Sequence, residues 1–400
     1  MSDAAILGQV ALGYSPFIDR KRVVTATRLT VFPLRPDAAL DVGALLHEVG
    51  NVWPATGARV SLNLASESLL HDLLLARPSP NLMVEVPAFM AVDPANVEAL
   101  RALHANGSTL LLKGRPLQEL PREVLPCFRY SIIDLADDRR LGDGSAPSGV
   151  TRSIAHVQSG VRTVADMEAS FARGAEAVLG WPIDDAVTTA ARGGQMTAAP
   201  GMQAIVELIR QVDQEAPIER LEDTLKRDPA LAFKLLRYIN SPAFGLRVEI
   251  SSFRHAIMML GYARLKRWLA LLLATASKDV NLKPVMFAAV RRGLLMEELV
   301  RGSGDEEMRN EIFICGVFSL LDRMFQQPFA QLLGSIPVPE KVRQALVDDA
   351  GPYRPYIELV HAIESESLYD FREAAERLMM SVSEINRAQL RALMSASELE

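Results

Sequence analysis

Few residues of this chain stand at spacings that could perform chemistry. One dipeptide, His71-Asp72, has the side chains of a metal-binding pair, but no companion ligand lies at a useful spacing. The two cysteines, Cys127 and Cys315, lie far apart, each in an apolar segment, so they can form neither a disulfide framework nor a zinc site. We therefore expect an ordinary helix position for the dipeptide and two buried, reduced thiols.

A small basic cluster is the other group of residues that could bind a ligand or a partner. Arg264, Lys266 and Arg267 stand beside Trp268 and could contact a phosphate group or an acidic partner, which makes these four residues candidate interaction residues. The alternative, which we favour, is a solvated helix face whose tryptophan packs inward.

Composition limits the classes of function. The chain has 400 residues, 49% of them hydrophobic, which is enough for two domains with sizeable cores. Its net charge of −6 disfavours direct nucleic-acid binding, which needs clustered basic residues. Neither a signal-peptide pattern nor an apolar run of membrane-spanning length occurs, so we expect a cytoplasmic protein without a membrane partner.

The elements that must position these residues differ between the two halves. Up to about residue 180, short β-rich runs alternate with helical stretches, which predicts βα units around a parallel sheet. The seven runs expected to be strands are Val23–Leu34, Arg59–Leu64, Leu82–Val86, Thr109–Leu112, Tyr130–Leu135, Ser153–Val157 and Ala177–Gly180. Seven strands favour an incomplete or modified barrel over a full eight-fold one.

Beyond residue 200 the apolar residues recur at helical spacing, as in Ile205, Leu208, Ile209 and Val212. This half is predicted to be all-α. The Ala-, Thr- and Gly-rich stretch Asp185–Pro200 reads as a linker. We therefore expect two domains, residues 1–190 and 191–400.

The first half resembles the EAL family, whose members hydrolyse cyclic di-GMP inside a modified TIM barrel. The segments that carry the resemblance are Tyr14–Asp19, Ser61–Leu64, Met83–Val86, Gly160-Val161 and Gly174–Trp181. No single segment is specific, but their order and spacing match the family over roughly residues 10–185.

The resemblance also implies that the catalytic residues are replaced. Hydrolysis with two metal ions requires a cluster of carboxylates. The family's catalytic positions correspond here to Thr27, Lys113-Gly114, Ile132, Ser159, Arg162 and Leu179, with Asp134 kept.

Only Asn63 and Glu85 match the family's metal-site pattern. Lys113, together with Arg28 and Arg162, would bring positive charge to that site, and two like unit charges about 4 Å apart repel by about 4 kcal/mol at an effective dielectric of about 20. We interpret Asn63 and Glu85 as remnants that bond the new cations. The segment between Tyr130 and Gly160 is also short, which predicts a missing helix and a barrel open on one side.

The second half resembles the HDOD domain, a non-catalytic relative of the HD phosphohydrolases. The resemblance is strongest over Asp228–Leu246 and Ile250–Gly261. Where the HD enzymes carry their His-Asp dipeptide, this chain has Ser319-Leu320, so no HD-type metal site is implied. We expect Asp322 to be an exposed helix residue.

The order of the two domains resembles the YuxH family of bacterial signalling proteins. This resemblance implies a regulatory protein of cyclic di-GMP or two-component signalling, linked to motility or biofilm. Because the catalytic groups are missing, we expect a non-enzymatic scaffold that acts through contact with other signalling proteins. No cofactor is expected, cyclic di-GMP is an unfavoured ligand, and a homodimer remains open.

Two other functions stay open at this point. The barrel could sense cyclic di-GMP without cleaving it, or it could be a residual metal-dependent phosphodiesterase. Binding needs fewer residues than catalysis, so the sensor ranks above the enzyme.

Overall fold

The computed structural model describes residues 5–35, 39–138, 154–185, 200–226, 252–277 and 279–397. Its residues form two compact units. One unit combines residues 1–185 with residues 361–387, and the other combines residues 186–360 with residues 388–400. The HDOD-like segment Asp228–Leu246 and most of the expected linker Asp185–Pro200 lie outside the described residues, so the linker remains a prediction.

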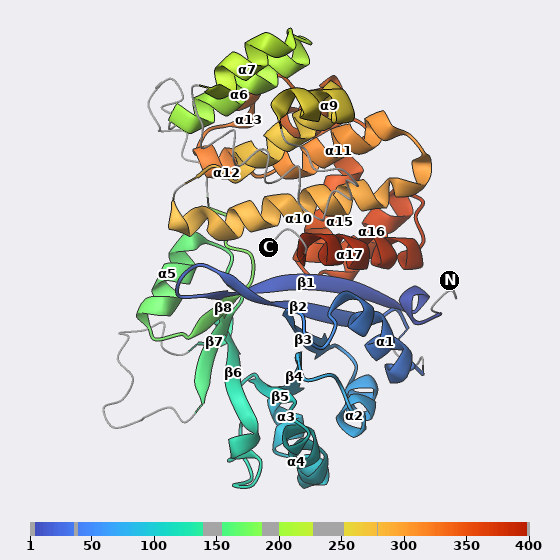
Figure 1. Ribbon diagram of the computed structural model, residues 1–400. Coiled ribbons are helices and arrows are strands. Elements are labelled where there is room, and N and C mark those ends of the chain that lie inside the picture. The colour runs from blue at the N-terminus through green and yellow to red at the C-terminus, as the bar shows by residue number, and fades with distance from the viewer. Residues whose placement is uncertain are drawn as a thin grey trace. The chain divides into compact units, whose positions relative to one another are not determined.

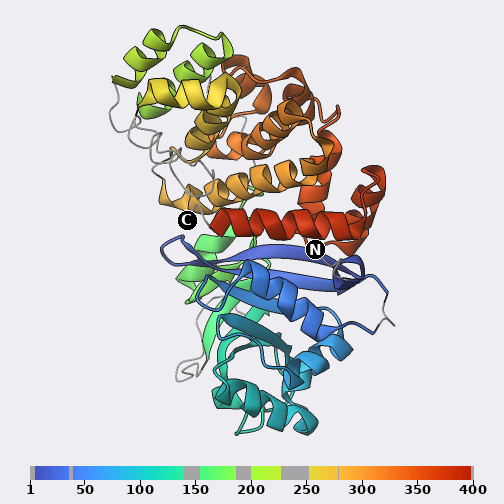
Figure 2. The ribbon, with the colours of Figure 1, turned by 45° about the vertical axis from the view of Figure 1, so that its right-hand side comes forward.

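The first unit is built on a closed barrel of eight strands (Figures 1 and 2). The strands are β1 (Val10–Asp19), β2 (Val24–Pro33), β3 (Arg59–Leu64), β4 (Leu82–Pro87), β5 (Thr109–Lys113), β6 (Phe128–Asp134), β7 (Ala155–Ser159) and β8 (Ala177–Leu179). The expected (β/α) barrel is therefore confirmed, and each of the seven predicted runs overlaps one of β2–β8.

The barrel closes through β1, which the sequence patterns did not predict as a strand. β1 runs antiparallel to both β2 and β8, whereas the pairs from β2 to β8 are parallel. Nine of its ten residues are buried, so β1 lacks the polar–apolar alternation that reveals a half-exposed strand. The sheet consequently has no gap, contrary to the expected incompleteness. Residues 139–153, where a helix was expected to be missing, lie outside the described part.

Short helices connect the strands on the outside of the barrel (Figure 1). They are α1 (Val42–Val52), α2 (Glu67–Leu75), α3 (Ala88–Ala91), α4 (Val97–Ala105) and α5 (Val164–Ala172). Sequence-encoded caps set their starts: the side chains of Ser66 and Thr163 accept hydrogen bonds from the amides of Leu69 and Asp166.

The described elements after residue 200 are all helical, as the spacing of apolar residues predicts. They are α6 (Pro200–Asp213), α7 (Ile218–Lys226), α9 (Phe253–Ala274), α10 (Lys283–Leu299), α11 (Glu306–Phe318), α12 (Leu321–Phe325), α13 (Phe329–Ser335), α14 (Glu340–Val347), α15 (Arg354–Glu364), α16 (Leu368–Arg377) and α17 (Val382–Ser397). Gly261 forms a kink inside α9, with φ of 72°.

Part of this C-terminal region belongs to the barrel unit. The side chain of Asn386 accepts a hydrogen bond from the amide of Leu12 and donates to the carbonyls of Leu7 and Val10. These bonds satisfy backbone groups where β1 has no neighbouring strand, since β8 pairs only with its last three residues.

Candidate functional site

The interior of the barrel is layered. Phe17, Ala26, Met83, Leu111, Ile132, Val157 and Leu179 form an apolar layer from seven strands. Because strand side chains alternate between two faces, residues two positions further on share that face. Along the parallel strands those residues are Arg28, Glu85, Lys113, Asp134 and Ser159. The polar layer therefore lies toward the carboxyl ends of the strands, where barrels carry their functional residues.

An ion pair stands at the centre of the polar layer. Arg28 Nη2 donates to Glu85 Oε2 at 2.8 Å, and Ser61 Oγ donates to Glu85 Oε1 at 3.0 Å. The Glu85 side chain is fully buried, and that of Arg28 is 11% exposed. A buried carboxylate is stable only when it is paired and hydrogen-bonded, and both oxygens of Glu85 are engaged.

A second contact joins the other retained residue to the other new cation. Lys113 Nζ donates to Asn63 Oδ1 at 2.7 Å, and Asn63 Nδ2 donates to Thr30 Oγ1 at 3.1 Å. The contacts of Glu85 and Asn63 thus agree with the interpretation of these residues as partners of new cations.

A carboxylate from the C-terminal region also enters this layer. Glu366 Oε1 accepts from Ser15 Oγ at 2.8 Å, and Glu366 Oε2 lies 3.6 Å from Arg28 Nη1. Sequence reasoning missed Glu366, because its contact with Ser15 spans 351 residues and no motif marks it. Strand alternation could have found Ser15, which shares the inner face with Phe17.

The charges shift one another's pKa values. Burial lowers the pKa of Lys113, and the nearby guanidinium of Arg28 lowers it further. Burial also acts to lower the pKa of Arg28, but Glu85 and Glu366 outweigh it, so this pKa is raised. Arg28 therefore remains a permanent cation at the centre of the layer.

Two positions inferred from the EAL resemblance need correction. Thr27 was matched to the signature glutamate, but the inner face carries Arg28, one residue later, because Ala26 belongs to the apolar layer. Arg162 does not join the site: its side chain is 62% exposed and pairs with Asp184.

The other residues that were matched to catalytic positions of the EAL family lie at the edge of the polar layer or in the apolar layer. Ile132 and Leu179 belong to the apolar layer. Ser159 donates to Asp134 Oδ2 at 3.2 Å, and Asp134 also accepts from the amide of Ala136. Gly114, just after β5, has a left-handed backbone with φ of 82°.

These side chains do not fit a pair of divalent ions. Such a site needs several carboxylates free to coordinate metal. Here Glu85 is engaged by Arg28 and Ser61, and two cations share the layer. Within the described ranges, no group of three or more His, Cys, Asp or Glu side chains is placed to hold a metal ion.

In the helical unit, Ser319 and Leu320 occupy the positions that correspond to the His-Asp dipeptide of the HD enzymes. Ser319 Oγ donates to the carbonyl of Gly316 at 2.7 Å and accepts from Arg292 Nη1 at 3.1 Å. Leu320 is buried. The expectation that Asp322 is exposed is wrong: its side chain is 13% exposed, and burial raises its pKa.

The basic cluster lies on α9 among acidic partners. Lys266 pairs with Asp213, and Arg264 Nη2 lies 3.8 Å from Glu306 Oε2. Arg264 is more than half exposed, so it is the member of the cluster most available to another molecule.

The other two members of the cluster are less exposed than Arg264. Arg267 donates to both carboxylate oxygens of Glu297, and its guanidinium lies 3.9 Å from the ring centre of Phe313. Trp268 is buried, as the inward-packing alternative predicts.

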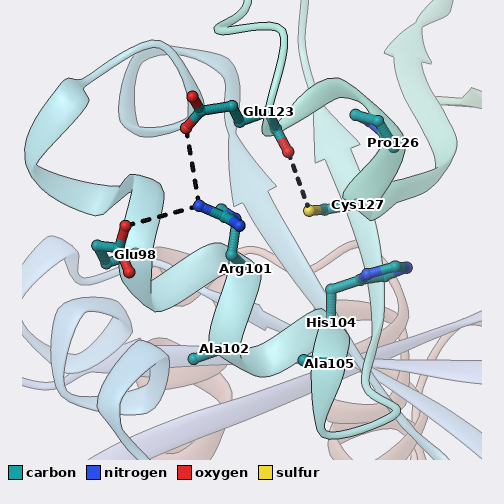
Figure 3. Close-up of a pocket in the computed structure, with 8 residues that line it drawn as sticks. All are labelled: Glu98, Arg101, Ala102, His104, Ala105, Glu123, Pro126 and Cys127. Atoms are coloured by element: carbon teal, nitrogen blue, oxygen red, sulfur yellow. Dashed lines mark hydrogen bonds and ion pairs between the residues drawn. The ribbon is translucent and has the colours of Figure 1, made fainter.

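A pocket of about 460 Å³ opens on the outside of the barrel (Figure 3). Arg101 of α4 extends into it between Glu98 and Glu123. The thiol of Cys127 donates to the carbonyl of Glu123, and burial raises the pKa of this thiol. Arg101, its two glutamate partners and Cys127 therefore bond within the pocket.

The remaining candidates are structural. Cys127 and Cys315 are both free and buried, as expected. His71 and Asp72 are exposed on α2, in agreement with an ordinary helix position. No helix in the described part of the chain has both the length and the apolarity needed to cross a bilayer.

Comparison with known proteins gives a family match and two curated relatives. The family model of the HDOD domain matches residues 198–326. YuxH of Bacillus subtilis, an uncharacterized protein, is 30% identical over 168 residues, which are 40% of this chain and 40% of YuxH. The cyclic di-GMP phosphodiesterase CdgJ of Vibrio cholerae is 28% identical over 171 residues, 42% of this chain and 40% of CdgJ. The chain thus spans about two fifths of the length of these relatives.

Among solved structures, a standalone EAL protein from Vibrio cholerae O395 in its c-di-GMP-bound form has a TM-score of 0.31 and 13% identity. The alignment covers 43% of this chain and 90% of that one. The sequence matches carry the assignment: this chain is a homologue of YuxH, with an HDOD domain at residues 198–326 that follows an eight-stranded (β/α) barrel.

Proposed function

We propose that this protein is a non-catalytic regulator in cyclic di-GMP signalling, which acts through contact with other signalling proteins. The observation that carries this proposal is the Arg28–Glu85 ion pair at the centre of the barrel's polar layer. It occupies the position at which the EAL resemblance would put metal-binding carboxylates.

The electrostatics argue against phosphodiester hydrolysis. Two divalent ions would have to bind beside Arg28 and Lys113, and each repelling pair of unit charges at about 4 Å costs about 4 kcal/mol at an effective dielectric near 20. Glu85 could reach a metal ion only by leaving Arg28, which would strand a buried guanidinium. Without bound metal ions, the described residues of the barrel cannot supply the metal-activated water that two-metal hydrolysis uses.

The signalling context is supported by the relatives. CdgJ is named as a cyclic di-GMP phosphodiesterase, and the HDOD match covers residues 198–326. In the helical unit, Ser319 and Leu320 replace the metal-binding dipeptide, which favours a binding role for this unit as well. The partner we propose is a signalling protein or a second copy of the chain.

The test is a turnover assay of the purified full-length protein with cyclic di-GMP and Mg²⁺ or Mn²⁺. We expect no hydrolysis above the rate without protein. Hydrolysis that Glu85→Ala abolishes would refute the proposal. Hydrolysis that survives in Glu85→Ala would indicate a contaminating enzyme. The protein would then be purified further until the hydrolysis rate of the variant equals the rate without protein.

A calorimetric titration with cyclic di-GMP separates the scaffold from the sensor. Heat of binding without turnover would replace the scaffold proposal with a non-hydrolysing sensor. Absence of binding, with the protein folded by circular dichroism, would favour the scaffold.

A further inference from the structure

Glu366 is the one carboxylate of the polar layer that comes from outside the eight strands, among the residues that the structure describes. It lies in the turn between α15 and α16, and its side chain reaches Ser15 of β1 and Arg28 of β2. Residues 361–387 belong to the same compact unit as the barrel, so this is a contact within one unit.

The backbone of the turn and the backbone of β1 both allow Glu366 to approach Ser15 and Arg28 closely. Glu366 has a left-handed backbone, with φ of 55°, which is uncommon for a residue with a side chain. On β1, Gly13 faces the turn, and a Cβ atom added there would lie 3.0 Å from Glu366 Cγ and 3.2 Å from the carbonyl oxygen of Ile363. The glycine therefore permits the close approach of the turn.

The two carboxylates around Arg28 are held differently. Glu85 is fully buried and lies 2.8 Å from the guanidinium, whereas Glu366 is 18% exposed and lies 3.6 Å from it. The Nε atom of Arg28 is buried and has no hydrogen-bond partner among the described atoms. Glu85 is thus the fixed partner of Arg28, and Glu366 is the partner that another anion could replace.

Lys113 adds a second positive charge to this place. Its ammonium donates a hydrogen bond to the neutral Asn63. Lys113 lies on the inner face of β5, beside β4, which carries Glu85, so it belongs to the same polar layer as Arg28 and Glu85. A guanidinium, an ammonium and a hydroxyl are the groups with which proteins bind phosphate oxygens.

We propose that Arg28, Lys113 and Ser15 form a binding site for a phosphate-type oxyanion. In this structure the carboxylate of Glu366 occupies that site. An external anion must displace the Glu366 carboxylate, so occupancy of the site is coupled to the position of residues 363–367. This inference rests on the proposed loss of the metal site, because the same cations carry both.

The experiment is a calorimetric titration of the full-length protein with inorganic phosphate, at constant ionic strength set by chloride. Removing a competitor raises the apparent affinity by a factor equal to the inverse of the fraction of time the site was free. We expect phosphate to bind Glu366→Gln and Glu366→Gly at least about tenfold more tightly than the wild type. Glycine suits the positive φ of this position, and glutamine keeps the side-chain volume.

The matched control is Glu373→Gln on α16, which removes a carboxylate that pairs with Arg377 instead. We expect its phosphate affinity to equal that of the wild type. Adding Arg28→Gln to Glu366→Gly should abolish the increase in phosphate affinity. Equal affinity in the wild type and both Glu366 variants, or a gain that survives without Arg28, would overturn the inference.

A measurement on the wild type covers the case in which the variants do not fold. The amides of Ser365, Glu366 and Ser367 donate to the carbonyls of residues 361–363 at the end of α15. Saturating phosphate should speed their hydrogen exchange relative to chloride, and unchanged exchange would count against displacement. Cyclic di-GMP turnover in these samples would contradict the proposed function, whereas phosphate affinity that ignores Glu366 would contradict only this inference.

Discussion

The polar layer of the barrel balances its charges with side chains of the chain itself. Glu85 is fully buried, and Arg28 is the cation that compensates it at 2.8 Å. Desolvating two charges is costly, so a pair of this kind adds little net stability, but the loss of one member leaves the other uncompensated. The stability of the fold therefore depends on whether each charge of this layer keeps its partner, more than on any single charge.

This pairing predicts unequal effects of single and double substitutions. Glu85→Gln should lower the free energy of unfolding by about 3–5 kcal/mol, because it leaves the guanidinium of Arg28 with only the more distant carboxylate of Glu366. The double variant Arg28→Met/Glu85→Leu should lie close to the wild type. The measurement is urea unfolding followed by tryptophan fluorescence.

The control for this cycle is Glu98→Gln, which removes an exposed partner of Arg101 at 3.7 Å. It should leave the unfolding midpoint unchanged, since exposed pairs contribute little. A double variant as unstable as Glu85→Gln would show that the pair itself, and not the stranded charge, provides the stability.

Lys113 predicts a dependence of stability on alkaline pH. Its pKa is lowered in the folded protein, so between that value and the ordinary 10.5 the unfolded chain binds more protons. The cost of burying the charged ammonium is fully present below the lowered pKa, and it disappears as pH rises toward 10.5. Stability therefore rises with pH across this window relative to a variant without the amine.

The measurement compares the wild type with Lys113→Met in urea unfolding at several pH values from neutral to alkaline. The difference in unfolding free energy should shift in favour of the wild type as the pH increases. A difference that stays constant would mean that the pKa of Lys113 is not lowered. Lys21→Met, at an exposed turn, provides the matched control.

At the scale of elements, α17 completes the edge of β1. Asn386 is fully buried, and its amide group bonds Leu7, Val10 and Leu12. An asparagine side chain can mimic a neighbouring strand because it carries both a donor and an acceptor. A single helical residue thereby satisfies backbone groups that an edge strand would otherwise expose.

Asn386→Ala should consequently destabilise the barrel unit by roughly 2–4 kcal/mol, because three buried backbone groups lose their partner. Hydrogen exchange at the amide of Leu12 should accelerate in the same variant. Asn51→Ala, exposed on α1, is the matched control and should change neither quantity. Unchanged exchange at Leu12 would refute the role of Asn386.

At the scale of the whole molecule, sequence order and compact units do not coincide. Residues 361–387 belong to the unit formed by residues 1–185, although about 175 residues separate the two segments in the chain. Contacts of such long range form late in folding, because closing the intervening loop costs entropy. The barrel unit is therefore complete only when the C-terminal region has been made.

This organisation predicts the behaviour of a fragment that ends at residue 190. The fragment lacks Glu366 and Asn386, so it should expose the edge of β1, aggregate and bind hydrophobic dyes. Co-expression with residues 191–400 should restore a soluble complex, and the same partner with Asn386→Ala should restore less. A monodisperse fragment with the thermal stability of the full-length protein would contradict this account.

Local patterns in the sequence determined much of this protein. Strand-like runs predicted β2–β8, and helical spacing predicted the α-helical second half. The replacement of carboxylates at Lys113 and Ser159 is what the resemblance to the EAL family implies. These features are readable because propensity and periodicity act over a few neighbouring residues.

Tertiary structure decided the rest. The fully buried β1 carries no alternation, and its role as the closing strand depends on pairing with β2 and β8. The inward position of Arg28, one residue from Thr27, follows from the register of the closed sheet, since a shift of one residue reverses the face. Glu366 reaches Ser15 across 351 residues, and only the folded chain brings such distant side chains together.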